Sequence, residues 1–464
     1  MKIKHHDIIV DPEHPFANCK LGREQYATIL TSLIGSYAEG FVLTINNEWG
    51  TGKTTFVKMW QRQLIIEGFK TLYFNAWEND FENSALTALM SELSSLKEKG
   101  TANLFKKVLK NGTILTKSVL PILLKAAMAK YLDKKVVKEL FEGVADSSND
   151  MLQTQIQEYT SKKVGLKEFK ISLEEFVQKS SIGKPIVFII DELDRCRPDY
   201  AVDVLEKVKH FFGVPGIVFV LSIDKTQLGN AIRGVYGSDR LNADEYLRRF
   251  IDVEYSIPEP DTEIFCKYLF DYFELDKFFL EHNRKQYREF QYDRGSFIDF
   301  SINLFRNAKL TLRQMEKIFV HSRIALNCFH SINYLFPKPF LFLIFLRDMH
   351  FDVYNKIKAQ KYNIQEFVEV FESLIPNNLE ELAMNQFLYT EAELLCLYDN
   401  MKPYGKRMLY SNNEGIEVKI NTSSAINVKI IDTIKTIRSD SALLENKISF
   451  LFDKIDLLDN FFPK

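Results

Sequence analysis

The chain is 464 residues long, which exceeds the size of most single cores and predicts two or three domains. Its 46% hydrophobic and 26% charged residues are typical of a globular protein, and they exclude a disordered or fibrous chain. The 60 basic residues nearly balance the 62 acidic ones, so the net charge by itself favours neither nucleic acid nor membrane as a partner.

The spacing of the cysteines and the hydropathy of the chain indicate in which cellular compartment the protein is expected. The five cysteines are scattered without a CxxC pair, so the sequence predicts neither a disulfide framework nor a zinc site, and the histidines show no metal-binding spacing. No stretch of about 18 uncharged apolar residues is present, and residues 1–10 lack the apolar core of a secretion signal. We therefore expect a cytoplasmic protein without a transmembrane segment.

Strands and helices are predicted to alternate in the first half of the chain. Short apolar runs predict strands over residues 41–45, 71–74, 185–190, 217–223 and 250–257. Apolar residues at helical spacing predict helices over residues 20–40, 54–63 and 199–212. Such alternation is typical of an α/β fold with a doubly wound parallel sheet.

Helical patterns dominate the remainder of the chain. The strands are interrupted by a mostly helical insertion, and the chain beyond Asp261 is helical apart from a short β segment predicted at residues 416–431. The predicted domains are a core at 1–260 with an insertion at about 83–180, a helical lid at 261–330 and a mostly helical C-terminal domain at 331–464.

The first predicted strand ends in a loop whose sequence is typical of phosphate binding, Asn47-Glu48-Trp49-Gly50-Thr51-Gly52-Lys53-Thr54. It matches G-x-x-x-x-G-K-[ST] except at its first position, where Asn47 replaces Gly. Because Asn tolerates positive φ, we expect Asn47 to preserve the turn. Gly50 and Gly52 allow the backbone to point its N–H groups at phosphate oxygens.

The residues that follow the glycines complete this prediction. Lys53 can reach the β- and γ-phosphates of a nucleotide, and the Thr54 hydroxyl can ligate Mg²⁺. Thr55 can contact the α-phosphate. The loop therefore predicts binding of Mg-ATP or Mg-GTP, and the absence of an NKxD guanine motif favours ATP.

The strand predicted at residues 185–190 ends in the acidic pair Asp191-Glu192. We expect Asp191 to hold the water shell of Mg²⁺ opposite Thr54, and Glu192 to polarise the attacking water. For Asp194 and Arg195, an ion pair that caps the following helix is as good an interpretation as a direct role in the site.

Several motifs together resemble the KAP family of P-loop NTPases. They are Leu21-Gly22-Arg23-Glu24, the loop through Thr55, Phe74-Asn75-Ala76-Trp77, Ile190-Asp191-Glu192-Leu193-Asp194-Arg195-Cys196-Arg197-Pro198 and Leu205-Glu206-Lys207-Val208-Lys209. The resemblance covers residues of about 20–330 and implies an ASCE-type, AAA-like sheet with a helical lid, and ATP as the nucleotide. Asn75 and Trp77 could brace the P-loop, although core packing is the favoured interpretation of Trp77. Glu192 stands where many relatives have a second Asp.

Other candidate site residues follow from the same resemblance. Ser222 or Asp224 would sit where a sensor contacts the γ-phosphate, and Arg248 or Arg249 where an arginine reaches a neighbouring subunit of a homo-oligomer. Arg313 resembles the arginine of a nucleotide-binding lid. An ordinary surface ion pair is an equally good interpretation of each.

Residues Lys99–Lys138 contain ten lysines and a single acid, Asp133. The favoured interpretation is a solvated helical hairpin whose apolar face packs on the sheet. Contact with anionic lipid, which would place the protein peripherally at the inner face of the membrane, is an alternative, as is contact with nucleic acid or a protein.

These features predict an ATPase that acts as a switch or motor and has partner or effector proteins. The Phe- and Leu-rich helices of residues 331–464 could form a partner surface or simply a core. Bacterial members of the family include phage-exclusion and defence-island proteins, so the resemblance implies antiphage defence. A nucleotide-dependent scaffold with little hydrolysis and a membrane-associated signalling adaptor are the alternatives.

Overall fold

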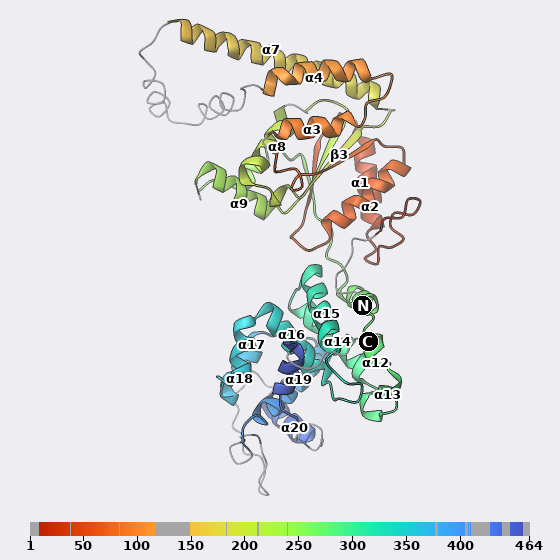
Figure 1. Ribbon diagram of the computed structural model, residues 1–464, viewed down its shortest axis with the longest axis vertical. Coiled ribbons are helices and arrows are strands. Elements are labelled where there is room, and N and C mark those ends of the chain that lie inside the picture. Colours follow the sequence, from red (N-terminus) through yellow and green to blue (C-terminus); the bar gives the residue numbers. More distant parts are fainter. Residues whose placement is uncertain are drawn as a thin grey trace. The chain divides into compact units, whose positions relative to one another are not determined.

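The computed structural model describes residues 9–457 except 38, 83, 117–148, 182, 211–212, 239, 376–378, 404–406, 408, 410–426 and 439–445. The chain divides into two compact units (Figure 1). The sheet unit is formed by Ile8–Pro258, and the helical unit is formed mainly by Glu259–Lys464.

The sheet unit is built on five parallel strands. They are β1 (Val42–Asn46), β2 (Thr71–Asn75), β3 (Ile186–Asp191), β4 (Ile217–Ile223) and β5 (Val253–Tyr255). Their order is β2-β3-β4-β1-β5, so β4 lies between the strand that leads to the P-loop and the strand that ends in the acidic pair. The predicted ASCE-type α/β fold is confirmed.

The last strand is shorter than the predicted 250–257. Before it, Arg249 and Phe250 lie in a hydrogen-bonded turn that follows helix α10 (Ala243–Leu247). After it, both backbone groups of Ile257 bond to the Asn47 side chain instead of a strand, and Pro258 and Pro260 lack the N–H that a longer ladder would require.

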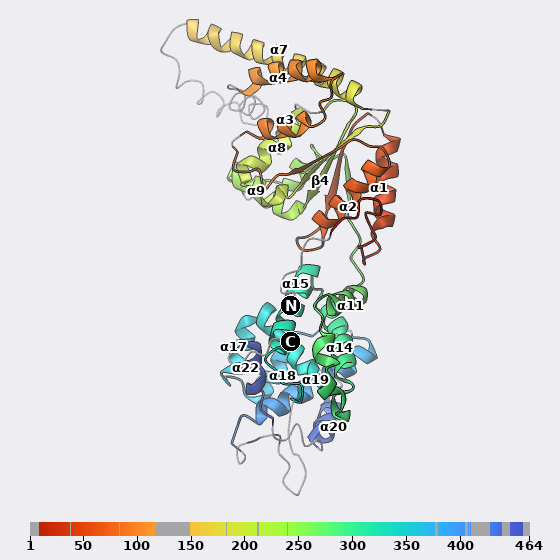
Figure 2. The same cartoon turned by 45° about the vertical axis from the view of Figure 1, so that its right-hand side comes forward.

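Helices cover both faces of the sheet, as the two views agree (Figures 1 and 2). One face carries α1 (Glu24–Ser36) and α2 (Lys53–Ile66), and the other carries α3 (Ala85–Ser94), α8 (Pro198–His210) and α9 (Lys225–Tyr236). Side chains of β3 alternate between these layers. Val187 and Ile189 pack with α1 and α2, whereas Phe188 and Ile190 pack with the other three helices.

The insertion contributes α4 (Ala102–Thr116) and α7 (Asn149–Ser180), which lie side by side beyond α3 (Figure 2). Phe105 of α4 packs against Phe176 of α7 in the same core as the sheet, and Lys107 forms a 3.0 Å ion pair with Glu175. Lys106 is exposed. Much of the lysine-rich segment lies outside the described residues. Within the described chain, no helix is long and apolar enough to cross a bilayer.

The helical unit contains α11 (Thr262–Tyr272), α12 (Asp276–Phe279), α13 (His282–Lys285), α14 (Asp293–Asn307), α15 (Leu312–Leu326), α16 (Pro337–Met349), α17 (Phe351–Lys358), α18 (Ile364–Ser373), α19 (Glu381–Asp399), α20 (Asn427–Arg438) and α22 (Ser449–Ile455). The β segment predicted at 416–431 is wrong over its described end, because residues from Asn427 belong to α20 and bury Ile430 and Ile434 at helical spacing. The division of this unit into a lid and a C-terminal domain stays a prediction.

Candidate functional site

The loop between β1 and α2 has the backbone that a phosphate-binding loop requires. Gly50 and Gly52 both have φ of 82°, a conformation that other residues adopt only with strain. No side chain of the described residues caps α2 at Gly52. The first N–H groups of this helix are therefore available to an anion, and the positive end of the helix dipole favours one.

Asn47 replaces the glycine that is usual at this position of the motif, and its backbone does not adopt a positive φ. It is absent from the described non-glycine residues in the left-handed region, so tolerance of positive φ is the wrong reason for an Asn at this position, although the glycine loop itself is kept. Its side chain instead bonds both backbone groups of Ile257, donating from Nδ2 to the carbonyl at 2.8 Å and accepting at Oδ1 from the N–H at 2.9 Å. Asn47 thus ties the start of the loop to the segment after β5.

Two buried cations hold the loop from inside. Lys53, which is 9% exposed, donates from Nζ to Asn47 O and, at 3.1 Å, to Glu48 O. Arg23, just before α1, donates to Thr51 O at 2.8 Å and to Gly52 O at 3.2 Å. The bracing role of Arg23 was missed, although its motif was noted, because no local pattern indicates a partner 28 residues away.

Charge around Lys53 links the loop to the acidic residues. Burial lowers the pKa of Lys53, and the carboxylates of Asp194, Asp224 and Asp191 oppose that shift in this order. The ammonium therefore lies within electrostatic reach of the carboxyl ends of β3 and β4.

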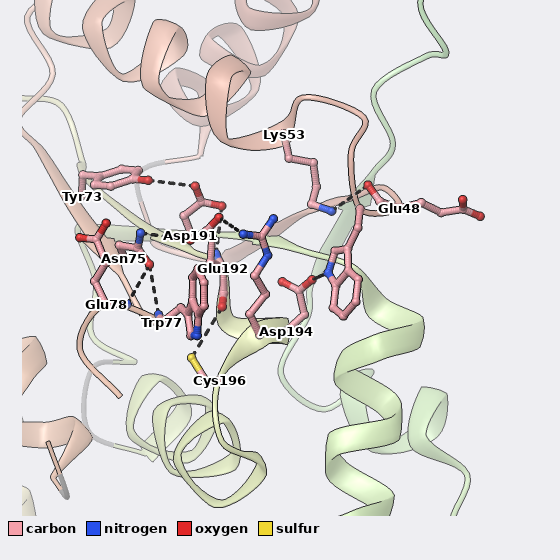
Figure 3. A network of polar contacts seen from close by, with 12 residues as sticks. Glu48, Lys53, Tyr73, Asn75, Trp77, Glu78, Asp191, Glu192, Asp194 and Cys196 are labelled. Atoms are coloured by element: carbon pink, nitrogen blue, oxygen red, sulfur yellow. Dashed lines mark hydrogen bonds and ion pairs between the residues drawn. The ribbon is translucent and has the colours of Figure 1, made fainter. Parts of the chain in front are cut away.

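The other residues of the loop differ in whether their side chain or their backbone faces the site. The Glu48 side chain is exposed and points away from Lys53 (Figure 3), so Glu48 contributes its backbone carbonyl, which also accepts from Thr51 Oγ1 at 2.8 Å. Thr54 and Thr55 lie half-buried in the first turn of α2. Their predicted contacts with Mg²⁺ and phosphate stay predictions.

Asp191 is the buried last residue of β3. The Tyr73 hydroxyl donates to its Oδ2 at 2.9 Å, and the Glu192 N–H donates to its Oδ1 at 3.0 Å (Figure 3). Burial and the Asp191 charge raise the pKa of Tyr73, so this phenol stays protonated and can donate. The carboxylate is thereby fixed at the edge of the sheet.

Glu192 begins the turn after β3 in the left-handed conformation, with φ of 60°. Its Oε1 lies 2.6 Å from Arg195 Nη1, and its Oε2 accepts from Asn75 Nδ2 at 3.2 Å. Burial raises the pKa of Glu192, Arg195 acts against this, and Asp191 adds to it. The residue is therefore a half-buried, oriented carboxylate with a raised pKa, as is common for a general base.

Trp77 is 50% exposed, so its interpretation as a core residue is wrong. The Asn75 Oδ1 accepts from the N–H groups of Trp77 and Glu78, at 3.1 and 3.2 Å, and this turn directs the chain away from the sheet. The guanidinium of Arg195 lies over the Trp77 ring, 5.6 Å from its centroid. Asn75 and Trp77 therefore position Glu192 and Arg195 rather than bracing the P-loop.

Asp194 bonds to the P-loop instead of forming an ion pair with Arg195. The Trp49 indole N–H donates to its Oδ2, across 145 positions of sequence. Burial raises the pKa of Asp194, and the Trp49 hydrogen bond is the largest opposing effect. The interpretation of Asp194 and Arg195 as a capping ion pair is wrong, because Arg195 pairs with Glu192.

The two candidate sensor residues lie at the same edge of the sheet. Ser222 is in register with Asp191 and Ile45, and its buried Oγ has no hydrogen-bond partner among the described residues. Asp224 caps α9, accepting at Oδ1 from the N–H groups of Thr226 and Gln227 at 3.1 and 3.2 Å. A sensor role stays a prediction for both.

The structure does not bring the three candidate arginines together with the residues at the carboxyl edge of the sheet. Arg248 and Arg249 precede β5 and so lie at the amino edge of the parallel sheet, opposite the P-loop. Arg248 forms a 3.2 Å ion pair with Glu245, and Arg313 is exposed in the first turn of α15 in the helical unit. Their roles toward a nucleotide stay predictions.

Comparison with known proteins identifies one family. A model of the KAP family P-loop domain matches residues 23–325. No curated protein matches the chain. The solved structures that match include the Aeropyrum pernix ORC2 protein in ADPNP-ADP complexes, at 11% identity over 94% of this chain and 93% of that chain, with a TM-score of 0.33. A DNA replication initiation factor matches at 13% identity over 97% and 100%, with a TM-score of 0.28. Scores this low add nothing to the topology described above.

Proposed function

Because the chain belongs to the KAP family of P-loop NTPases, we propose that it binds Mg-ATP and hydrolyses it as a molecular switch or motor. The observation that carries this proposal is the meeting of opposite charges at one edge of the sheet. The charge of Asp191 is one of those that oppose the lowering of the Lys53 pKa by burial. Asp191 is followed directly by Glu192, whose carboxylate is oriented by Arg195. This is the arrangement that phosphoryl transfer to water needs.

The residues fit a Mg-triphosphate. The N–H groups from Gly50 to Lys53, the two left-handed glycines and the uncapped helix start would hold phosphate oxygens. Thr54 and Asp191 would hold Mg²⁺ through the hydroxyl and through water. The ion, when bound, neutralises charge on the phosphate oxygens.

Glu192 would accept the proton of the attacking water. A general base works best when its pKa lies near the operating pH, and burial moves the pKa of Glu192 in that direction. Asn75 and Arg195 are positioning residues, because each contacts one oxygen of this carboxylate.

Calorimetry and turnover of the purified chain test the proposal. We expect uptake of ATP in the presence of Mg²⁺ and loss of uptake in Lys53→Ala. Glu192→Gln should bind ATP while its turnover falls by about 100-fold or more. Equal turnover in wild type and Glu192→Gln would contradict hydrolysis by Glu192 and favour the scaffold alternative. Tighter uptake of GTP than of ATP would identify GTP as the nucleotide.

The proposal extends to a homo-oligomer. Since Arg248 and Arg249 lie at the sheet edge opposite the P-loop, they would serve the site of a neighbouring copy, and turnover per chain would then rise with protein concentration. The assignment of Arg313 to the nucleotide site stays a prediction. Antiphage defence, partner proteins, a cytoplasmic location and contact of Lys99–Lys138 with lipid or nucleic acid stay predictions of the family and the composition.

A further inference from the structure

The side chain of Asn47 forms a latch between the P-loop and Ile257. Besides the two hydrogen bonds to Ile257, the backbone of Asn47 is held on both sides. Its carbonyl accepts from Lys53 Nζ, and its N–H donates to Ile223 O at 3.2 Å, extending the β1–β4 ladder. A single residue therefore connects the phosphate-binding lysine, the end of β4 and the segment after β5.

Ile257 lies at the exit from the sheet unit. It is buried, whereas Pro258 is exposed and is the last residue of that unit. The next helix, α11, begins four residues beyond Pro258 at Thr262, with Asp261 as its cap. The latch thus acts on the last anchored residue before the chain enters the helical unit.

The linker between Ile257 and Asp261 is stiff. Pro258 and Pro260 fix their own φ, and each restricts the residue before it to extended conformations. Four consecutive residues are therefore limited in the backbone conformations that they can adopt. A change in the backbone at Ile257 would therefore be carried toward α11 rather than absorbed within the linker.

Occupancy of the P-loop would change how the backbone of Asn47 is held, because Lys53 bonds its carbonyl. The Lys53 ammonium has three N–H donors, and two of them are used by the carbonyls of Asn47 and Glu48. A phosphate would draw the ammonium toward itself, and this movement would weaken the contact of Lys53 with the Asn47 carbonyl. Glycine, the usual residue at this position, has no side chain with which to pass such a change to Ile257.

We propose that Asn47 couples nucleotide occupancy of the P-loop to the conformation of the linker Ile257–Asp261. This coupling rests on the proposed nucleotide binding. Asn47 is a positioning residue in this role, and its side-chain amide is the coupling element, because it bonds both backbone groups of the linker's first residue.

Hydrogen exchange of peptides that cover the linker tests the coupling, with and without a non-hydrolysable ATP analogue and Mg²⁺ at saturation. In wild type, exchange at the Ile257 N–H should change on addition of the analogue. In Asn47→Gly this N–H should exchange about five- to tenfold faster without nucleotide, as expected for the loss of one hydrogen bond, and should no longer respond to the analogue. Asn47→Asp keeps the acceptor for Ile257 N–H but removes the donor, and should give an intermediate response.

Asn46→Ala is the matched control. The Asn46 side chain bonds Lys225 N and Glu254 at the same sheet edge but does not contact Ile257, so its linker should still respond. A response that persists in Asn47→Gly, or analogue binding without a response in wild type, overturns the coupling alone. Calorimetry that detects no uptake by wild type overturns the proposed function, and the coupling with it.

Discussion

Arg195 Nη1 lies 2.6 Å from Oε1 of Glu192, while the Arg195 guanidinium also lies over the ring of Trp77. The ion pair joins two residues of one turn, but its geometry depends on a tryptophan from the segment after β2. The proposed general base is therefore held by a cation that a second segment positions.

Removal of this cation should change the pH dependence of hydrolysis. Arg195 acts against the burial that raises the pKa of Glu192, so Arg195→Gln should raise that pKa further. Because the ionised carboxylate is the active form, the acidic limb of the pH–kcat profile should move to higher pH. Arg197→Gln is the control, since Arg197 donates to Asp80 O at 2.6 Å in the same region without pairing with Glu192. An unchanged limb in Arg195→Gln would contradict the assignment of Glu192 as the base.

The contact between Trp49 and Asp194 should matter most at neutral pH. Trp49→Phe removes the indole donor, so the pKa of Asp194, already raised by burial, should rise further above its unfolded value. The variant should lose about 1–3 kcal/mol of unfolding free energy at neutral pH. The loss should shrink as pH falls through the raised pKa, because the folded carboxyl is then protonated in both proteins.

Chemical unfolding at neutral and acidic pH measures this dependence. A double-mutant cycle with Asp194→Asn supplies the control, because the two substitutions should be non-additive if they remove the same contact. Equal losses at both pH values would mean that the Trp49 ring, rather than its hydrogen bond, stabilises the loop.

Replacement of Arg23 should weaken the P-loop. The two Arg23 nitrogens bond two successive carbonyls, and the single ammonium of lysine cannot reproduce that fork. Arg23→Lys should cost about 2 kcal/mol of stability and lower ATP affinity by about tenfold. Arg62→Lys serves as the control, because half-buried Arg62 donates to the single carbonyl of Pro12 at 2.9 Å. Unchanged affinity in Arg23→Lys, measured by calorimetry, would show that the loop holds its shape without this brace.

Glu391 in α19 should limit the stability of the helical unit at high pH. It is 5% exposed, its Oε1 has no hydrogen-bond partner within the described part of the chain, and burial raises its pKa to about 8. Since the folded pKa lies above the unfolded one, stability from the protonated form is complete at acidic pH and is lost as pH rises to about 8. Glu391→Gln should match wild type in acid and exceed it by on the order of a few kcal/mol near the raised pKa.

Unfolding followed across this pH range tests the prediction. Exposed Glu369, in α18, gives a matched control as Glu369→Gln, which should follow wild type at every pH. A Glu391→Gln variant less stable than wild type at high pH would mean that the ionised carboxylate has partners that stabilise it.

The sequence by itself was sufficient for the main features of the sheet unit. Short apolar runs and the glycine loop act over a few residues, so they predicted the strands and the helix at Lys53. Because parallel strands end at a common edge, an acidic pair after one strand could be assigned to the same edge as the P-loop. The structure places Asp191 in register with Ser222 of β4, next to the P-loop strand.

The partners of the polar side chains were decided by tertiary structure. Asn47 bonds a residue 210 positions away, and Trp49 bonds one 145 positions away. Trp77 is exposed although a large aromatic side chain is expected in the core, because the turn at Asn75 directs the chain outward. Backbone preference and hydrophobic periodicity are local, whereas a hydrogen bond forms between whichever groups the strand order brings to one edge. That order is set by the packing of the whole sheet unit.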